Sequence, residues 1–207
     1  MQPDAMPRAL HRVATGLLVM LALAGPVRAE MPRWIIDESH FAVGFLVDHI
    51  GFARVLGMFL RAEGDFLFDP QTMEIGSGRF VIHADSVFTN DEARDRHLRG
   101  SDFLNVNSHP VIVFTPARLD VGGDGKGRLT GELELLGQKR PVTLDLSVNK
   151  VDRYPFPLGG LLSRTQVLGA SMRGTIRRSD WGMTYGLDRG LVGDEIELIL
   201  EFEARRR

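Results

Sequence analysis

The chain has 207 residues, no cysteine, and 25 basic against 27 acidic residues. The near balance of charge is a poor basis for binding nucleic acid or an anionic membrane surface. The lack of cysteine excludes thiol nucleophiles, cysteine-ligated zinc, iron–sulfur clusters and disulfides.

Residues 1–29 show the three parts of a secretory signal peptide. Arg8 and Arg12 precede an uncharged, mostly apolar run over 13–24, and small residues at Val27 and Ala29 follow it. That run is too short to span a bilayer, which needs ~17–25 residues. We therefore predict cleavage after Ala29, export to the periplasm, and one soluble domain over 30–207 that is not stably inserted in a membrane. Without residues 1–29, the 25 basic and 27 acidic residues fall to 22 and 26, a net charge of −4.

Alternation of apolar and polar residues predicts eight strands. In chain order they cover 40–49, 55–69, 78–84, 110–120, 128–137, 142–149, 168–176 and 195–204. The phase of the alternation changes within 55–69, so we expect a bulge near Leu60–Arg61. Mostly short turns favour an all-β, antiparallel sheet. Eight such strands can close into a barrel that holds one small ligand, although a sandwich with a solid core fits the same periodicity.

A charged segment, DEARDRHLRGSDFL over 91–104, lies between the third and fourth predicted strands. Thr89 and Glu92 have the spacing of a capping box. Acidic residues open the segment, basic residues close it, and Gly100 suits its end. This pattern predicts a short helix that lies over one end of the barrel.

No motif in the chain signals a catalytic or metal centre. The five histidines of 30–207 show no metal-ligand spacing, and both the GxSxG elbow and the phosphate-binding loop are missing. Asp95 and His97 suit an orienter and a general base, but no nucleophile accompanies them. We therefore predict no metal, no cofactor and no catalytic residue, and keep an enzyme that acts on a lipid-like substrate through His97 and Asp95 as the alternative.

Four blocks of the sequence, in order, resemble the YceI-like family. The opening block matches its D…H..V.F.V.H.G...V.G.F pattern, and the charged segment matches R.DHLRS.DFL.V followed by P.I.F. GRLTGELELLGQKRPVTLDL and GTIRRSDWGM are similar to the third and fourth blocks. The matching residues of the first two blocks are Asp37, His40, Val43, Phe45, Val47, His49, Gly51, Val55, Gly57, Phe59, Arg94, Asp95, His97, Leu98, Arg99, Asp102, Phe103, Leu104, Val106, Pro110, Ile112 and Phe114.

The resemblance implies an exported, lipocalin-like eight-stranded barrel with a long apolar tunnel for polyisoprenoids or other amphiphilic chains, such as quinones or fatty amides. We accordingly expect a carrier or sequestering protein with a bound lipid as its ligand, and a homodimer is a further possibility. The expected apolar lining comprises Val43, Phe45, Val47, Phe59, Phe66, Ile112, Phe114, Leu133, Leu144 and Leu146, with Trp181 and Met183 at a rim or cap.

Seven charged or polar residues are expected at one end of the tunnel: Arg94, Asp95, His97, Arg99, Asp102, Arg178 and Asp180. Their nearly balanced charges favour internal ion pairs that close that end. Two alternatives are head-group recognition, with an arginine or His97 binding a phosphate or carbonyl oxygen, and acid–base catalysis.

Overall fold

A computed structural model describes residues 30–156 and 165–207. The predicted signal peptide lies outside the described residues. The described elements are β1 (Arg33–His49), β2 (Ala53–Phe59), β3 (Ala62–Asp69), β4 (Glu74–His83), the 3-10 helix η1 (Ala84–Ser86), β5 (Val87–Phe88), α1 (Glu92–Arg99), β6 (Val111–Val121), β7 (Lys126–Leu135), β8 (Gln138–Arg153), β9 (Gln166–Arg177), η2 (Arg178–Trp181) and β10 (Val192–Arg206).

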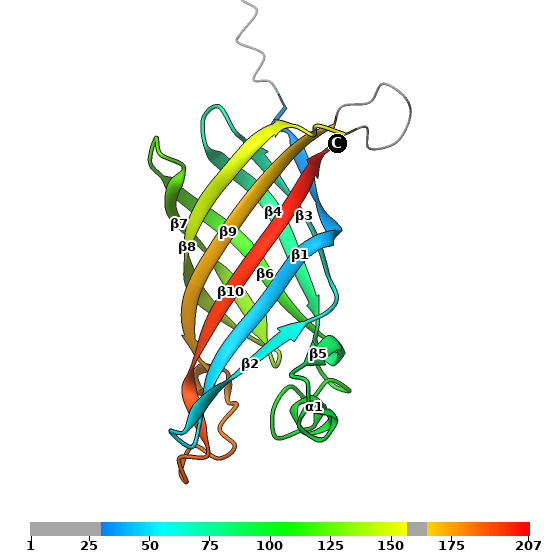
Figure 1. Ribbon diagram of the computed structural model, residues 1–207. Coiled ribbons are helices and arrows are strands. Elements are labelled where there is room, and N and C mark those ends of the chain that lie inside the picture. Colours follow the sequence, from blue (N-terminus) through cyan, green and yellow to red (C-terminus); the bar gives the residue numbers. More distant parts are fainter. Residues whose placement is uncertain (1–29, 157–164) are drawn as a thin grey trace, which may run out of the picture. The chain divides into compact units, whose positions relative to one another are not determined.

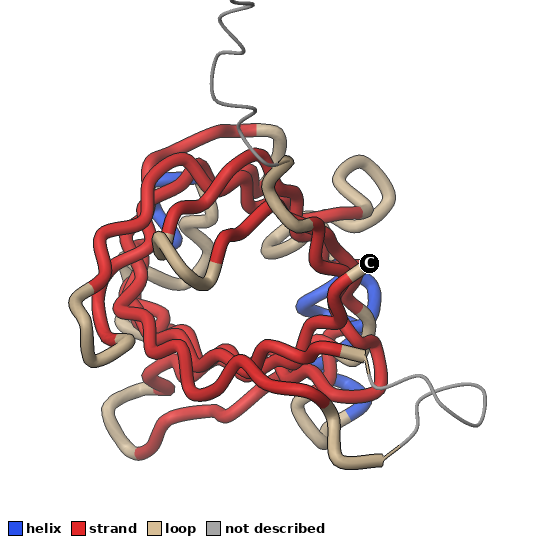
Figure 2. The backbone as a smooth tube through the Cα atoms, turned by 90° about the horizontal axis from the view of Figure 1, so that it is seen from above, coloured by secondary structure: helices blue, strands red, loops and turns tan. Residues whose placement is uncertain are grey.

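The sheet closes on itself because the first and last strands pair. The strand order is β10-β9-β8-β7-β6-β4-β3-β1-β2-β5, and β1 also pairs with β10 along most of its length. β2 and β3 together occupy one place in the wall, so the barrel is eight-stranded and antiparallel, as predicted. Figure 1 shows the tilted strands from the side, and Figure 2 shows the ring they form from above.

β1 pairs with two different partners along one edge. Arg33–Ile35 pair with β3, whereas Val43–His49 pair with β2. The chain at Leu60–Arg61 belongs to no strand. The predicted bulge is therefore a full break, which divides the predicted strand 55–69 in two. The break leaves β2 paired with the C-terminal half of β1 at one end of the barrel.

One end of the barrel is packed solid. Trp34 and Ala204 are fully buried, and the Trp34 indole N–H donates to the Phe68 carbonyl at 2.8 Å. In the other half, Phe45 and Leu198 face the interior yet stay partly exposed, which indicates space that side chains do not fill. The hollow half is thus the part of the barrel that can hold a ligand.

The helix α1 forms where the sequence predicted it, but with a different cap. The Asp91 carboxylate accepts a hydrogen bond from the Arg94 backbone N–H at 2.8 Å. Thr89, the predicted cap, instead donates to the Asp95 carboxylate. The capping-box prediction was wrong, whereas the helix and its end at Gly100 are confirmed. Within the described residues, no helix has the length and apolar character needed to cross a membrane.

Two connections cover the hollow end of the barrel. One is α1 with the residues that follow it, and the other runs from η2 to β10. They meet through aromatic rings: the Tyr185 ring centroid lies 5.0 Å from His97 and 5.3 Å from Phe103. Ring contacts of this kind are favourable at these distances, so they hold the two connections together as a floor.

Candidate ligand-binding cavity

The hollow half of the barrel encloses a cavity whose surface is almost entirely apolar. The cavity has a volume of about 170 Å³. An apolar cavity of that order stays dry and takes up apolar guests. Most of the lining comes from inward residues of β1, β4, β6–β10 and the floor, so the site belongs to the wall as a whole.

Nine of the twelve apolar residues predicted from the sequence lie on the cavity wall. They are Val43, Phe45, Val47, Phe59, Ile112, Phe114, Leu133, Leu144 and Met183. Phe66, Leu146 and Trp181 are buried but do not line it. Trp181 was expected at a rim, yet it is only 2 % exposed, and its indole N–H donates to the Leu133 carbonyl at 3.2 Å. Trp181 therefore fixes the η2 segment to β7.

Phenylalanine rings separate the cavity from the packed end. Phe80, Phe114 and Phe202 line the cavity, and Phe66 stacks on Phe80 at a centroid distance of 5.5 Å. Phe202 meets Phe66 and Phe80 edge to face at 6.1 and 6.0 Å. These rings form the inner end of the cavity, which explains why Phe66 lies just behind the lining.

Sequence reasoning missed much of the wall, including three residues of the charged segment. Leu98, Phe103 and Leu104 line the cavity although their segment was read as a polar closure. Their signal was present, because apolar residues recur on one side of an otherwise charged stretch. The C-terminal strand adds Ile196, Leu198, Leu200 and Phe202, whose alternation had been recognised but not assigned to the lining.

Arg178 is the one residue of the predicted polar set that reaches the cavity wall. It is 1 % exposed, and its guanidinium donates to the carbonyls of Met183, Tyr185, Val192 and Gly193 at 2.8–3.0 Å. Burial lowers the pKa of this side chain, which the nearby Asp194 carboxylate partly offsets. The cation therefore holds the floor connection against β10.

Two charged residues of the helical segment, Asp95 and Arg94, bond to Thr89. Asp95 is buried and accepts from both the N–H and the hydroxyl of Thr89, at 2.8 and 2.6 Å. Arg94 donates to the hydroxyl and carbonyl of the same threonine at 2.7 Å. These bonds pin the start of α1 to the residues that precede it. The predicted set of mutual ion pairs is mostly replaced by such local bonds.

His97 pairs with Asp102 rather than with Asp95. Its Nε2 lies 2.9 Å from a carboxylate oxygen of Asp102, and both side chains are about half exposed. The Asp95 carboxylate bonds to Thr89, so Asp95 does not orient His97 as an acid–base pair would require. Asp180 is exposed on η2. None of His97, Asp102 and Asp180 lines the cavity.

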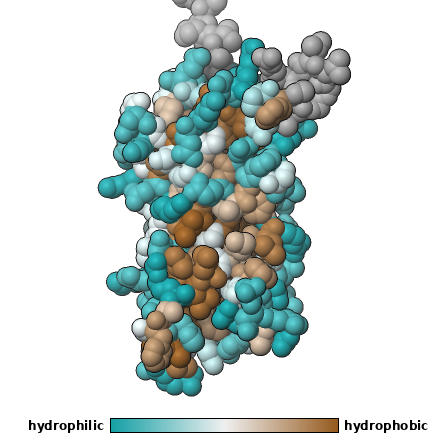
Figure 3. Space-filling model, in the orientation of Figure 1, coloured by the Kyte–Doolittle hydropathy of each residue, from teal (hydrophilic) through white to brown (hydrophobic). Residues whose placement is uncertain are grey.

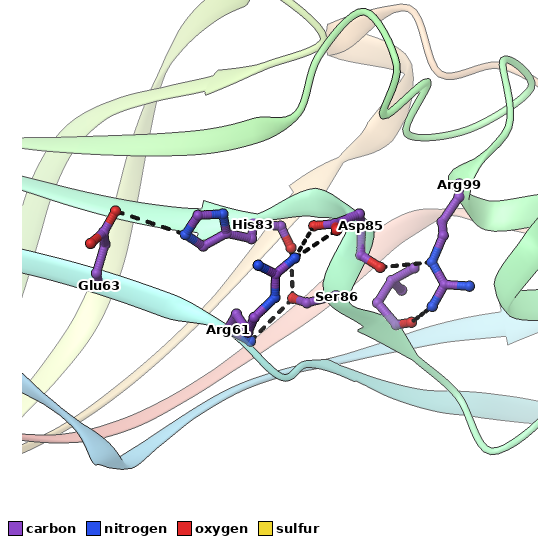
Figure 4. Close-up of polar contacts among 7 residues, drawn as sticks. Arg61, Glu63, His83, Asp85, Ser86 and Arg99 are labelled. Carbon is purple, nitrogen blue, oxygen red and sulfur yellow. Dashed lines mark hydrogen bonds and ion pairs between the residues drawn. The ribbon is translucent and has the colours of Figure 1, made fainter.

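A short strap, residues 84–88, closes the wall between the strand break and the floor (Figure 4). On one side the Arg61 guanidinium donates to both oxygens of the Asp85 carboxylate, each at 2.6 Å. On the other side Arg99 donates to the carbonyls of Asp85 and Val87 at 2.7 Å. Val87, 1 % exposed, faces the cavity from this strap. Arg99 is thus a link between the helix and the cavity wall, outside the cavity itself.

A cluster of possible metal ligands lies at the irregular part of β1. Asp37, His40 and Glu203 bring their ligand atoms within 4.8 Å of one another. However, the Asp37 carboxylate already accepts from Ser39, His40 and the guanidinium of Arg205. A cation already bonded to this carboxylate opposes a second one. The arrangement fits an internal network better than a metal site.

The fold and the cavity together define a class: a closed antiparallel β-barrel with an apolar interior cavity. Within that class, the chain belongs to the YceI-like domain family, whose model matches residues 34–204. It is 32% identical to a UPF0312 protein of Pectobacterium atrosepticum over 188 residues, which are 91% of this chain and 93% of that protein.

Solved structures agree on the fold. The YCEI protein of Campylobacter jejuni superposes with a TM-score of 0.66 at 27% identity, covering 77% of this chain and 90% of that one. A polyisoprenoid binding domain from Saccharophagus degradans superposes with a TM-score of 0.61 at 15% identity, covering 86% of this chain and 99% of that one. At 15% identity the second likeness concerns the fold alone.

Proposed function

We propose that the protein binds a long-chain amphiphilic lipid, such as a polyisoprenoid, a quinone or a fatty amide, inside the barrel. It acts as a carrier or sequestering protein in the periplasm, after removal of residues 1–29. The observation that carries this proposal is the almost wholly apolar cavity enclosed by the wall and the floor. Binding draws on the hydrophobic effect, ~25 cal/mol for each Å² of apolar surface removed from water.

Two further observations support a lipid over a small polar ligand. The buried charge on the wall, Arg178, already donates to four carbonyls. We therefore expect a polar head group to lie near the floor and the strap, where it can contact water, rather than in the middle of the cavity. The structural relative from Saccharophagus degradans is itself named as a polyisoprenoid binding domain.

An enzymatic function receives no support from the arrangement around His97. A general base must come within about 2.6–3.2 Å of the proton it removes. His97 contacts Asp102, Phe103 and Tyr185. Of these three residues, only Phe103 lies on a substrate path through the cavity. We therefore propose a binding protein without catalytic residues.

The test is extraction of the purified protein with organic solvent, followed by mass spectrometry of the extract. A long-chain lipid at about one molecule per chain supports the proposal. Leu198→Trp fills the cavity and should lower the lipid content several-fold. Thr175→Trp, on the neighbouring strand with its side chain exposed, is the matched control and should retain the lipid.

Three outcomes count against the proposal. An empty wild-type protein that also fails to take up polyprenol or quinone from detergent solution removes the lipid-binding function. Turnover of a lipid ester that His97→Ala abolishes replaces binding with catalysis. Equal lipid content in Leu198→Trp and the wild type places the ligand outside the cavity.

A further inference from the structure

The hairpin β1–β2 carries apolar side chains on both of its faces. Its inner face, which includes Phe45 and Phe59, forms part of the cavity wall. Its outer face carries Leu56 and Met58, with exposed fractions of 57% and 37%. Leu46 lies opposite Leu56 in the register, so the outer apolar surface continues across the pair.

The opposite wall shows the pattern expected of a barrel in water. Along β7 and β8, the outward pairs include Arg128 with Asp145, Thr130 with Thr143, and Glu134 with Lys139. An antiparallel sheet with one buried face normally alternates apolar and polar residues in this way. The loss of alternation in β2 therefore marks an outer surface that suits an apolar partner.

The exposed apolar surface extends beyond β2 in both directions. Phe88 of β5 pairs with Met58 and is exposed, as is Leu60 after the strand. At the tip of the hairpin, Ile50 and Phe52 are 46% and 90% exposed. Figure 3 shows hydrophobic side chains gathered at this tip and over the lower part of the same wall. We call these residues, Ile50, Phe52, Leu56, Met58, Leu60 and Phe88, the hairpin patch.

The turn at the tip has an unusual residue in an unusual conformation. The His49 backbone carbonyl accepts a hydrogen bond from the Phe52 N–H at 3.1 Å. Between them, Ile50 has a φ of 54° and Gly51 a φ of 71°. Turns of this kind favour Asn-Gly, and a β-branched residue at positive φ is a true outlier. Ile50 therefore places an apolar side chain at the tip, although a β-branched residue disfavours this backbone conformation.

Charge around the hairpin patch is neutralised locally. Arg54 pairs with Glu197 at 2.6 Å, and Arg61 pairs with Asp85 at 2.6 Å. Among the residues that the structure describes, cations near the patch are not in excess, so the patch does not suit anionic phosphates or nucleic acid. An apolar surface with a neutral border is instead suited to the interface of a neutral bilayer, where aromatic and aliphatic side chains insert.

The position of the tip favours a bilayer over a second copy of the chain. Phe52 projects from the end of the hairpin, so a partner packed flat along β2 leaves it in water. A bilayer surface covers the tip and the neighbouring outer face together. Among the described residues, the free edge of β2 is paired only at Met58 and Phe59. That edge gives a lipid a short path between the bilayer and the inner face of the same hairpin.

We propose that the hairpin patch docks the protein on a neutral lipid surface, where the cavity exchanges its lipid. The inference rests on the proposed lipid-binding function and adds the place of exchange. The expected interaction is driven by apolar contact and depends weakly on salt concentration.

The test is flotation of the purified protein with phosphatidylcholine vesicles, using the double variant Ile50→Asn/Phe52→Ser. Asn restores the residue that the turn prefers, so the variant should fold as well as the wild type. Removing two inserted apolar side chains should weaken vesicle binding by at least about tenfold. Phe156→Ser is the control: Phe156 is 68% exposed and follows β8 at the end of the barrel away from the hairpin, so it should bind vesicles like the wild type.

Uptake of polyprenol from detergent solution is measured in parallel, because it needs the cavity but no bilayer. A double variant that takes up lipid normally but no longer floats supports docking. A wild-type protein that does not float, or a double variant that floats equally well, overturns docking while leaving cavity binding intact. If the double variant changes only the oligomeric state in light scattering, the patch binds a second copy and the proposal is wrong. Failed uptake by the wild type instead refutes the proposed function itself.

Discussion

The ring of Phe45 lies directly over Gly57, its register partner on β2. A Cβ added at Gly57 would stand 2.2 Å from Cζ of that ring. The clash involves only the far end of a side chain that borders the cavity, so the ring has empty space into which it can turn.

Gly57→Ala should therefore impair lipid binding more than stability. The displaced Phe45 ring enters the cavity and reduces the lipid content several-fold, while the free energy of unfolding falls by about 1 kcal/mol, at the low end of overpacking effects. Adding Phe45→Leu should restore the lipid content. Lipid content is measured by mass spectrometry, and stability by urea unfolding of lipid-free protein.

Gly131→Ala provides the contrast. Its added Cβ would stand 2.5 Å from the Thr115 carbonyl oxygen and 2.4 Å from the Phe114 ring. Backbone cannot turn aside as a ring does, so this variant should lose about 2–3 kcal/mol of stability. Equal stability losses in the two glycine variants would contradict the idea that the cavity absorbs the Phe45 ring.

Arg178→Met should be among the most destabilising single changes in the barrel. It leaves four buried carbonyls without their donor, and breaking such a buried charged group costs about 3–5 kcal/mol. Arg189→Met is the matched control, because Arg189 is exposed and stacks over Tyr185 at 5.7 Å; its cost should stay below about 1 kcal/mol. Urea unfolding of both variants checks the difference, and similar costs would refute a structural role for Arg178.

Asp37 should make the barrel sensitive to acid. Burial opposes ionisation of its carboxylate, but hydrogen bonds from Ser39, His40 and Arg205 outweigh burial and hold its pKa well below the usual range. A lowered folded-state pKa contributes stability above the unfolded value of about 3.9, and this contribution is lost as the pH falls further. Asp37→Asn should cost about 2 kcal/mol at pH 7. Its deficit against the wild type should shrink below pH 4 in urea unfolding.

His40 should show the opposite dependence. The hydrogen bond and charge of Asp37 raise the pKa of His40 above its ordinary value of 6.5. A raised folded-state pKa contributes stability that is full below the unfolded pKa and is lost as the pH rises through the folded one. NMR titration of the imidazole should therefore give a pKa that drops toward 6.5 in Asp37→Asn. An unchanged titration would show that the two groups are uncoupled.

Arg99→Met should loosen the strap at residues 84–88. It removes two charge-assisted hydrogen bonds to the carbonyls of Asp85 and Val87, so amides of the strap should exchange with solvent faster, by about tenfold or more. Bound lipid should dissociate faster as well, because Val87 faces the cavity. Arg96→Met, which removes only an exposed pair with Glu92, should change neither rate. Hydrogen exchange and lipid release into acceptor vesicles measure both effects.

Alternation of residue types was enough to predict an antiparallel sheet with one apolar face, but it fitted a sandwich as well as a barrel. The resemblance to the YceI-like family favoured the barrel. The change of phase placed an irregularity at Leu60–Arg61. Alternation could not show that the strand breaks there, because the break is seen only in the separate pairing of β2 and β3 with β1. The strands were also underestimated in length: β1 begins at Arg33, seven residues before the predicted start.

The polar part of the site was the hardest to predict. Spacing alone placed Thr89 as the cap and Asp95 beside His97, whereas contacts in three dimensions exchange those partners. Balanced charge along a segment does not reveal whether its groups bond to one another or to backbone carbonyls. Arg178 illustrates the second case, because its four acceptors become neighbours only when η2 folds back on β10.

The layer of rings formed by Phe66, Phe80 and Phe202 makes the cavity a molecular ruler. From Val192 near the floor to Phe202 at the layer, the lining of β10 spans ten residue steps, which is about 33 Å along the strand. A chain that extends beyond this stop has to fold back or leave its remainder outside the barrel. Size selection among homologous lipids would then follow from where the aromatic layer stands, independent of any contact with a head group.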